Sequence, residues 1–168
     1  MAMPTPHSSF IIRPVNWHAS YDALHAVRRA VFIEEQRVPE ELEWDDIDER
    51  CYHVLAMSAG GVPIGTGRLL PDGHIGRMAV LREWRGKGVG SAIVKALLDL
   101  AQKDGFRMVR LNAQTHAVDF YARHGFTVIG EEFMEAGIPH REMQTRLTAK
   151  NISHREHRDH RGKTNNEI

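Results

Sequence analysis

The chain has 168 residues, with 22 basic and 22 acidic residues, 42% apolar residues and a single cysteine, Cys51. This composition is typical of one soluble globular domain, and the neutral charge balance argues against a nucleic-acid partner bound through a basic surface. No apolar run is long enough to span a membrane, no secretory segment is visible, and one cysteine excludes a disulfide framework or a thiolate-rich metal site. We therefore expect a cytoplasmic protein with no membrane partner.

Apolar spacing and turn residues predict strands interrupted by helices. The expected strands are Phe10–Ile12, Cys51–Ser58, Pro63–Leu70, a strand from the turn at 71–73 to Val80, Met108–Ala113, Phe126–Met134 and His140–Leu147. The expected helices are Ser20–Glu35, one from the glycine-rich stretch at 85–90 to Gly105, and Ala117–Arg123. The acidic stretch up to Glu49 is expected to be irregular or to form a short second helix. This order of elements indicates a mixed α/β sheet covered by helices.

The composition changes after Leu147. Residues 148–168 hold almost no large apolar side chain, so they cannot form a core of their own. We therefore divide the chain into a domain over 1–147 and a polar C-terminal tail over 148–168. His154, His157 and His160 recur every third residue, which is a weak metal-ligand pattern. We expect a solvated tail and no metal.

The neutral total hides an uneven distribution of charge. Residues 34–50 contain nine acidic and two basic residues, whereas residues 77–110 contain eight basic and three acidic residues. Solvated faces explain most charge runs. The acidic stretch nevertheless suggests that one region faces a cation, and the basic stretch that another faces an anion.

A basic, glycine-spaced segment lies between a predicted strand and a predicted amphipathic helix. Its sequence is Arg85-Gly86-Lys87-Gly88-Val89-Gly90-Ser91. Glycines let a ligand approach the backbone, and the first N–H groups of a helix have no partner within the helix, so this segment can hold a pyrophosphate. It is not a Walker loop, because no Gly-Lys-Ser/Thr closes it, and its GxGxG spacing departs from the GxGxxG of dinucleotide-binding proteins.

Two motifs resemble the GNAT superfamily of N-acetyltransferases. Arg85-x-x-Gly88-x-Gly90 matches the Arg/Gln-x-x-Gly-x-Gly/Ala signature, and Tyr121-Ala-Arg-His-Gly125-Phe126 matches the later Tyr-x-x-x-Gly-Phe. Phe32-Ile-Glu-Glu-Gln36-Arg-Val-Pro39 and Gly137-Ile-Pro-His140 resemble a bacterial subgroup of this superfamily. The resemblance covers about Phe10 to Leu147.

The resemblance implies a mixed, mostly antiparallel sheet of about seven strands, with a splayed central parallel pair and helices on both faces. It also implies that acetyl-CoA lies in the splay. The pantetheine arm would pair with the backbone of Met78, Ala79 and Val80, and the pyrophosphate would contact Arg85, Gly86, Lys87, Gly88, Val89, Gly90 and Ser91. Many members carry Asn three residues before the position that Ala117 occupies in this sequence. Gln114 stands there, with Asn112 nearby on the strand, and both are candidate cofactor contacts.

The implied reaction is direct attack of a primary amine on the thioester. Tyr121 resembles the general acid of the family, which protonates the leaving sulfur. The base is less clear: His140 ranks first, Glu34 is also a candidate, and Glu35, Glu43, Asp45 and His53 are alternatives. Cys51 is interpreted as a small buried residue, because no oxyanion motif follows it.

These observations predict an acetyl-CoA-dependent N-acetyltransferase acting on a small-molecule or lysine amine, with no metal. The acidic segment from Glu34 to Glu49 suggests, as a hypothesis, a cationic acceptor such as a polyamine, an aminoglycoside-like amine or a lysine side chain. One alternative is a catalytically silent coenzyme A-binding module with a regulatory role. The other is a nucleotide-dependent redox enzyme, which the loop spacing disfavours. The sequence is also compatible with a homodimer.

Overall fold

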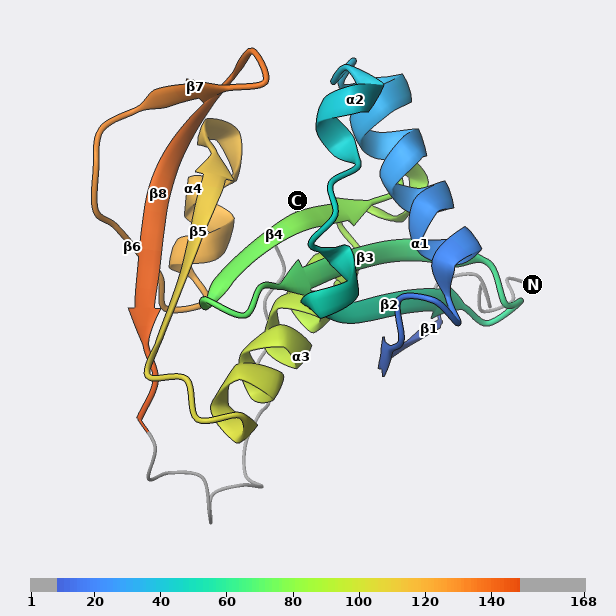
Figure 1. Cartoon of the computed structure of the whole chain (residues 1–168), viewed down its shortest axis with the longest axis horizontal. Helices are drawn as coiled ribbons and strands as arrows, with labels where there is room; N and C mark the ends of the chain where they lie inside the picture. Colours follow the sequence, from blue (N-terminus) through green and yellow to red (C-terminus); the bar gives the residue numbers. More distant parts are fainter. Residues whose placement is uncertain (1–8, 149–168) are drawn as a thin grey trace, which may run out of the picture.

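The computed structural model describes residues 9–148, and all structural statements refer to this part of the chain. Its strands form one eight-stranded sheet in the order β1-β2-β3-β4-β5-β8-β6, with β7 paired to β8 (Figure 1). The strands are β1 (Phe10–Val15), β2 (Tyr52–Ser58), β3 (Pro63–Leu69), β4 (His74–Val80), β5 (Met108–Gln114), β6 (Thr127–Val128), β7 (Phe133–Glu135) and β8 (Ile138–Arg146). The helices are α1 (Tyr21–Arg28), the π-helix η2 (Arg29–Glu35), α2 (Glu40–Glu43), α3 (Val89–Lys103) and α4 (Val118–Ala122), with short 3-10 turns η3 (Asp48–Arg50), η4 (Arg82–Trp84) and η5 (Thr115–Ala117).

The expected mixed sheet with a splayed parallel pair is confirmed. β4 and β5 are the parallel pair, and the other paired strands are antiparallel. The pairing of β4 with β5 is limited to His74 with Arg110 and Ile75 with Leu111, both near the start of β4. Beyond Ile75 the two strands diverge, so the sheet opens in its middle.

The sheet has eight strands rather than about seven, because the single strand expected over 126–134 is divided. β6 and β7 both pair with β8, and residues 129–132 between them lie outside either strand. Gly130 and the two exposed glutamates that follow it form this break. Gly130 has no side chain to pack on the sheet, and none of these three residues pairs with β8, so the strand is interrupted here.

Helix α3 lies very close to the middle of the sheet. A Cβ built on Gly67 would lie 2.8 Å from Met78 Sδ and 2.9 Å from Ile93 Cγ2 of α3, and one on Gly65 would lie 3.0 Å from Ile93 Cδ1. Only glycine therefore allows this approach. The buried residues of α3, including Ile93, Val94 and Leu97, form the main core with β2–β5.

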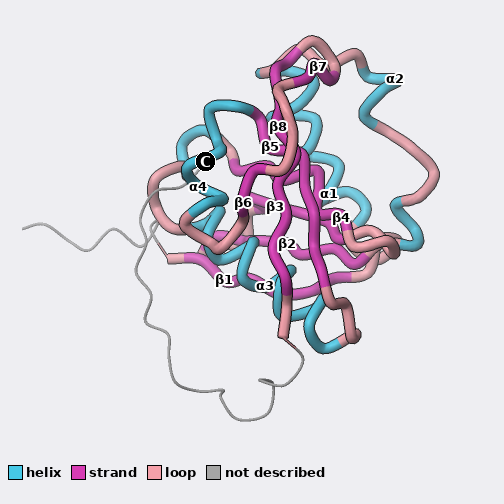
Figure 2. Tube along the Cα trace, turned by 90° about the vertical axis from the view of Figure 1, so that its left-hand side faces the viewer, coloured by secondary structure: helices cyan, strands magenta, loops and turns pink. Residues whose placement is uncertain are grey.

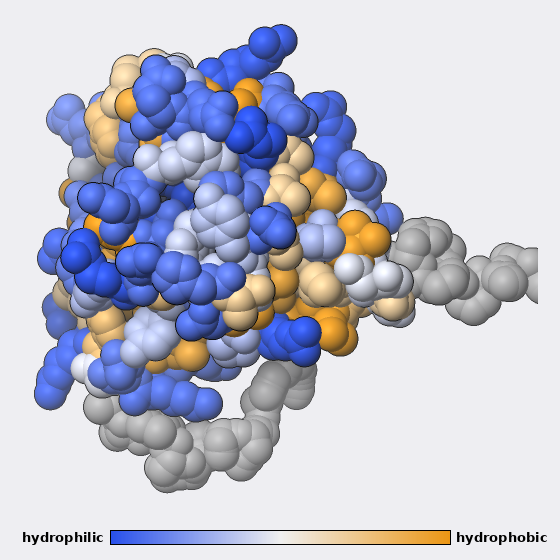
Figure 3. Space-filling model, turned by 45° about the vertical axis from the view of Figure 1, so that its right-hand side comes forward, coloured by the Kyte–Doolittle hydropathy of each residue, from blue (hydrophilic) through white to orange (hydrophobic). Residues whose placement is uncertain are grey.

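Helix α1 covers the other face of the sheet (Figure 1) and continues into η2, so the helix expected over 20–35 is confirmed. η2 has the hydrogen bonds of a π-helix, which connect residues five apart rather than four, as in the bond from Gln36 N–H to Val31 O at 3.0 Å. The outer surface on this side is mainly hydrophilic, with small apolar areas (Figure 3). Within residues 9–148 no helix is long and apolar enough to cross a lipid bilayer.

Candidate active site

A cavity of about 870 Å³ occupies the opening between β4 and β5. One wall comes from η2 and α2, the floor from β4, and the opposite wall from β5 and the β7–β8 hairpin. Figures 1 and 2 both show α2 and β7 at the same end of the molecule, on either side of this opening. The lining includes Phe32, Gln36, Leu42, Glu43, Arg68, His74, Arg77, Met78, Ala79, Val80, Arg85, Asn112, Gln114, Tyr121, Glu135 and His140.

The glycine-spaced segment has the backbone conformation expected of an anion-binding turn. Gly86 and Gly88 have φ of +77° and +91°, a region that side-chain-bearing residues rarely adopt. Gly88 is the N-cap of α3, and no side chain caps this end of the helix. The N–H groups of Val89, Gly90 and Ser91 therefore have no acceptor within the helix, and the helix dipole adds positive potential there. Lys87 is exposed beside them.

Arg85 is already paired within the protein. Its Nη1 and Nη2 donate to the two carboxylate oxygens of Glu35 at 2.8 and 2.7 Å, and its Nε donates to Val80 O at 2.9 Å. Arg85 thus joins the end of η2 to the end of β4, and Lys87 is the cation of the segment that has no partner among residues 9–148. The hydrogen bond from Arg85 also lowers the pKa of Glu35, which makes this carboxylate a weak proton acceptor.

Tyr121 lies on α4 with its ring in the core and contributes to the cavity wall. It is 5% exposed and packs edge-on against Phe120 and Phe126. Burial raises the pKa of Tyr121 above its ordinary value. No hydrogen bond of its hydroxyl occurs within the described residues, so the O–H group is available to a ligand in the cavity.

His140 also reaches the cavity, from the start of β8. Its Nδ1 lies 2.7 Å from Ile138 O, and because a carbonyl can only accept, Nδ1 carries the proton. The neutral ring then has its lone pair on Nε2, as a proton acceptor requires. His140 is 7% exposed and its ring stacks on Phe133, which fixes the ring orientation.

Of four further predicted residues, two have side chains that line the cavity. Asn112 and Gln114 both line the cavity: Asn112 Nδ2 donates to Glu135 Oε1 at 3.2 Å, and Gln114 Nε2 donates to Gln36 Oε1 at 3.0 Å. Glu34 is exposed and does not line the cavity. The hydroxyl of Ser91 is hydrogen-bonded with His124 Nε2 at 3.1 Å, so its backbone N–H is the group left for a ligand.

Comparisons with known proteins agree with this geometry. Residues 18–147 match the family model of the acetyltransferase (GNAT) domain. The chain belongs to the GNAT family. It is 44% identical over 121 residues to the "Uncharacterized N-acetyltransferase YjcF" of Bacillus subtilis, covering 70% of this chain and 86% of that protein.

Solved structures also share the fold of this GNAT chain. An acyl-CoA N-acyltransferase from Pseudomonas aeruginosa superposes with a TM-score of 0.71 at 28% identity, covering 82% of this chain and 99% of that one. Escherichia coli ElaA superposes with a TM-score of 0.73 at 27% identity, covering 81% and 99% of the two chains. Family and fold together support acyl-CoA N-acyltransferase activity, for which the family uses acetyl-CoA.

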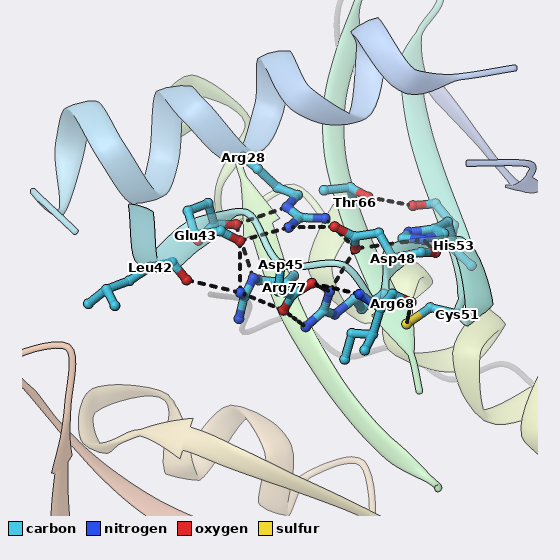
Figure 4. Close-up of polar contacts among 12 residues, drawn as sticks. Arg28, Leu42, Glu43, Asp45, Asp48, Cys51, His53, Thr66, Arg68 and Arg77 are labelled. Atoms are coloured by element: carbon cyan, nitrogen blue, oxygen red, sulfur yellow. Dashed lines mark hydrogen bonds and ion pairs between the residues drawn. The ribbon is translucent and has the colours of Figure 1, made fainter. Parts of the chain in front are cut away.

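The acceptor side of this GNAT cavity contains an ion-pair cluster that the sequence analysis missed. Three arginines and three carboxylates from different elements meet there (Figure 4). Its members are Arg28, Glu43, Asp45, Asp48, Arg68 and Arg77. Arg28 donates to Glu43 Oε2 and to Asp48 Oδ1, both at 2.9 Å. The signal in the sequence was the acidic stretch, but its partners lie in α1, β3 and β4.

The cluster neutralises the middle of the acidic stretch. Asp45 and Asp48 accept from Arg68 at 3.0 and 2.6 Å, and Glu43 also lies 3.1 Å from Arg77 Nε. Burial acts to raise the pKa of Asp45, but hydrogen bonding and charge from Arg68 outweigh it and the pKa is lowered. Burial raises the pKa of Glu43 despite the nearby arginines. The charges of these three carboxylates are therefore largely compensated by arginines, and the cationic acceptor stays a prediction.

Two other candidates do not reach the cavity. His53 is buried on β2, where its Nε2 lies 2.8 Å from Asp48 O and its ring stacks on Trp17. Cys51 donates its S–H to Ile47 O, and burial raises its pKa to about 11. A thiol with this pKa is protonated at neutral pH and is a poor nucleophile, in agreement with the structural role expected of Cys51. His154, His157 and His160 lie outside the described residues.

Proposed function

We propose that this protein is an acetyl-CoA-dependent N-acetyltransferase that moves the acetyl group to a primary amine by direct attack in a ternary complex. The observation that carries the proposal is the opening between β4 and β5. Because β5 leaves β4 after Ile75, the edge of residues 78–80 has backbone groups that β5 does not meet. An extended pantetheine arm can pair with such an edge as an additional strand would.

The glycine-spaced segment fits a pyrophosphate. A Cβ built on Gly86 or Gly88 would meet no atom within 4 Å, so the space over the backbone is open. The N–H groups at the start of α3 have no acceptor within the helix and would form an anion site of the type found at helix N-termini, to which Lys87 adds a positive charge. Val80 O accepts one hydrogen bond from Arg85 and, as a carbonyl oxygen, has a second lone pair for the cofactor.

The residues of the cavity supply the proton transfers that the reaction needs. His140 Nε2 accepts a proton from the substrate ammonium, and the free amine then attacks the thioester carbonyl carbon. A backbone N–H near Val80 stabilises the charge that develops on the carbonyl oxygen. The C–N bond forms, the C–S bond breaks, and the sulfur takes the proton of Tyr121. The amide nitrogen releases its remaining extra proton to solvent, and Tyr121 regains a proton from solvent. His140 then releases the proton that it took from the ammonium, so one proton is produced overall.

The buried setting of Tyr121 suits this role. Proton transfer from a phenol to a thiolate is modestly uphill in water, because their ordinary pKa values are about 10 and about 8.5–9. Burial raises the pKa of Tyr121. The same apolar surroundings also raise the pKa of a sulfur that leaves beside it, so the mismatch between donor and acceptor stays small.

The test combines binding with turnover. Calorimetry should show binding of acetyl-CoA and none of NAD, and thiol release should accelerate when a suitable amine is added. Gly88→Val should weaken acetyl-CoA binding at least tenfold, because φ is +91° and the side chain would fill the anion site. The matched control is Gly130→Val, at an open position without positive φ. Binding without turnover would favour the silent module, and unaltered binding by Gly88→Val would contradict the proposed anion site.

A further inference from the structure

The acceptor end of the cavity contains a cation whose hydrogen-bonding capacity is not used. Three arginines line the cavity: Arg68, Arg77 and Arg85. Both terminal nitrogens of Arg85 donate to Glu35, and both terminal nitrogens of Arg68 donate to Asp45. Within residues 9–148 these four nitrogens are therefore all paired with carboxylates.

Arg77 differs from the other two. Its Nη2 donates to Glu43 O at 2.8 Å and lies 3.2 Å from Asp45 Oδ2, and its Nε lies against Glu43. Its Nη1 has no partner among the described residues, yet it is not among the buried unpaired atoms, so it retains accessible surface. Figure 4 shows the guanidinium of Arg77 at the edge of the cluster. Since Arg77 lines the cavity, the two N–H groups of Nη1 are the donors of this residue that are left for a ligand there.

The backbone holds Arg77 in this position. Arg77 has φ of +49°, which is uncommon for a residue with a side chain. The pairing of β3 with β4 shifts between Thr66 and Arg68, so that Arg77 and Met78 together lie opposite Gly67. This is a β-bulge, a feature that re-aims side chains next to functional sites. The bulge lies directly before the edge of β4 that would hold the pantetheine arm.

The electrostatics favour an anion at Arg77. Two carboxylates also line the cavity: Glu43 is paired with Arg28 and Arg77, whereas Glu135 is exposed on β7, keeps its charge and accepts a hydrogen bond from Asn112. Burial, together with the charges of Arg68 and Arg28, lowers the pKa of Arg77. A guanidinium stays protonated in proteins even so. A carboxylate would use the unpaired Nη1, since Arg recognises carboxylates with charge-assisted hydrogen bonds.

We infer that the acceptor amine also carries a carboxylate group and that Arg77 binds this group while the amine faces Tyr121 and His140. The inference rests on the proposed function and names the substrate class for the same site. Arg77 is a specificity-determining residue, so its loss should act mainly on KM for the acceptor. The apolar part of this wall, including Leu42 and Leu70, would contact the carbon chain between the two charged groups.

The experiment compares matched acceptors on the unmodified protein. The acids are glycine, β-alanine, 4-aminobutanoate, 6-aminohexanoate, leucine and lysine, each paired with its primary amide. Thiol release from acetyl-CoA gives kcat/KM for each member. At least one acid should exceed its amide at least tenfold. Equal rates throughout, or thiol release with amides alone, would overturn the inference and leave the proposed function standing. Failure of acetyl-CoA to bind would instead overturn the proposed function.

Variants of Arg77 provide the second readout. Arg77→Gln and Arg77→Lys should reduce the acid-to-amide preference at least tenfold, mainly through KM, while acetyl-CoA affinity stays within about twofold. Arg110→Gln, which removes an exposed arginine of β5, is the control and should retain the preference. An unchanged preference in folded Arg77→Gln would overturn the inference. The acceptor series on the unmodified protein decides the matter if the variants do not fold.

Discussion

Replacing Tyr121 by phenylalanine separates catalysis from structure unusually well. The hydroxyl makes no hydrogen bond within the described residues, so its removal breaks no internal contact. The ring contacts with Phe120 and Phe126, at centroid distances of 4.9 and 6.0 Å, remain in Tyr121→Phe. We therefore expect the free energy of unfolding to change by less than about 1 kcal/mol, because the substitution is buried but leaves no unpaired group behind.

The catalytic effect of Tyr121→Phe should be much larger. A positioned general acid typically contributes about 10²–10⁴-fold to the rate. A loss of about 100-fold in kcat corresponds to about 2.7 kcal/mol of transition-state stabilisation. The Kd for acetyl-CoA should not change, because the hydroxyl acts only when the sulfur leaves.

The assay is thiol release at saturating acetyl-CoA with an acceptor found active, together with calorimetry and thermal unfolding. Tyr21→Phe, on the exposed side of α1, is the matched control and should keep full activity. Since burial raises the pKa of Tyr121, its deprotonation should not limit kcat up to about pH 10. Unaltered kcat in a folded Tyr121→Phe protein would show that this tyrosine is not the acid.

Two further predictions concern stability. Arg28→Ala should lower the free energy of unfolding by about 3–5 kcal/mol, because it leaves Glu43 and Asp48 buried with one partner fewer. Thermal unfolding of Arg28→Ala should show a decrease in Tm of about 10 °C. The control is Arg13→Ala at an exposed position, which should change Tm very little. An equal Tm for the two variants would contradict the role of the cluster. Burial lowers the pKa of His25 and His53, so below about pH 6.5 the unfolded chain binds more protons than the folded one and stability should fall. His53→Gln should flatten this decline in Tm between pH 7.5 and 5.5, and a Tm independent of pH would refute the argument.

Local signals in the sequence were sufficient for most of the fold. The helix over 20–35, the strands on either side of the turn at 71–73, and the glycine-spaced entry to α3 all depend on residues a few positions apart. Apolar periodicity and turn chemistry report such short-range order directly. The division of 126–134 into β6 and β7 was missed, because pairing of both pieces with β8 compensates for the break at Gly130.

The polar part of the site could not be predicted in the same way. Arg28 and Glu43 are 15 residues apart, Arg85 and Glu35 are 50 apart, and Gln114 and Gln36 are 78 apart. A count of charges along the chain does not say which carboxylates meet an arginine in the folded state. The acidic stretch thus suggested a cationic acceptor, whereas the folded chain uses Glu43, Asp45 and Asp48 internally and leaves Arg77 with free donors.

These long-range contacts also determine the width of the cavity. Beyond Ile75 no backbone pairing holds β4 and β5 at a fixed separation. The Glu35–Arg85 ion pair fixes η2 to the end of β4, the Gln36–Gln114 hydrogen bond joins η2 to the end of β5, and Arg77 joins α2 to β4. Both walls are thus attached through η2 and α2, and contacts within the protein hold the acceptor side in shape. Binding therefore need not order this wall, which lowers its entropic cost.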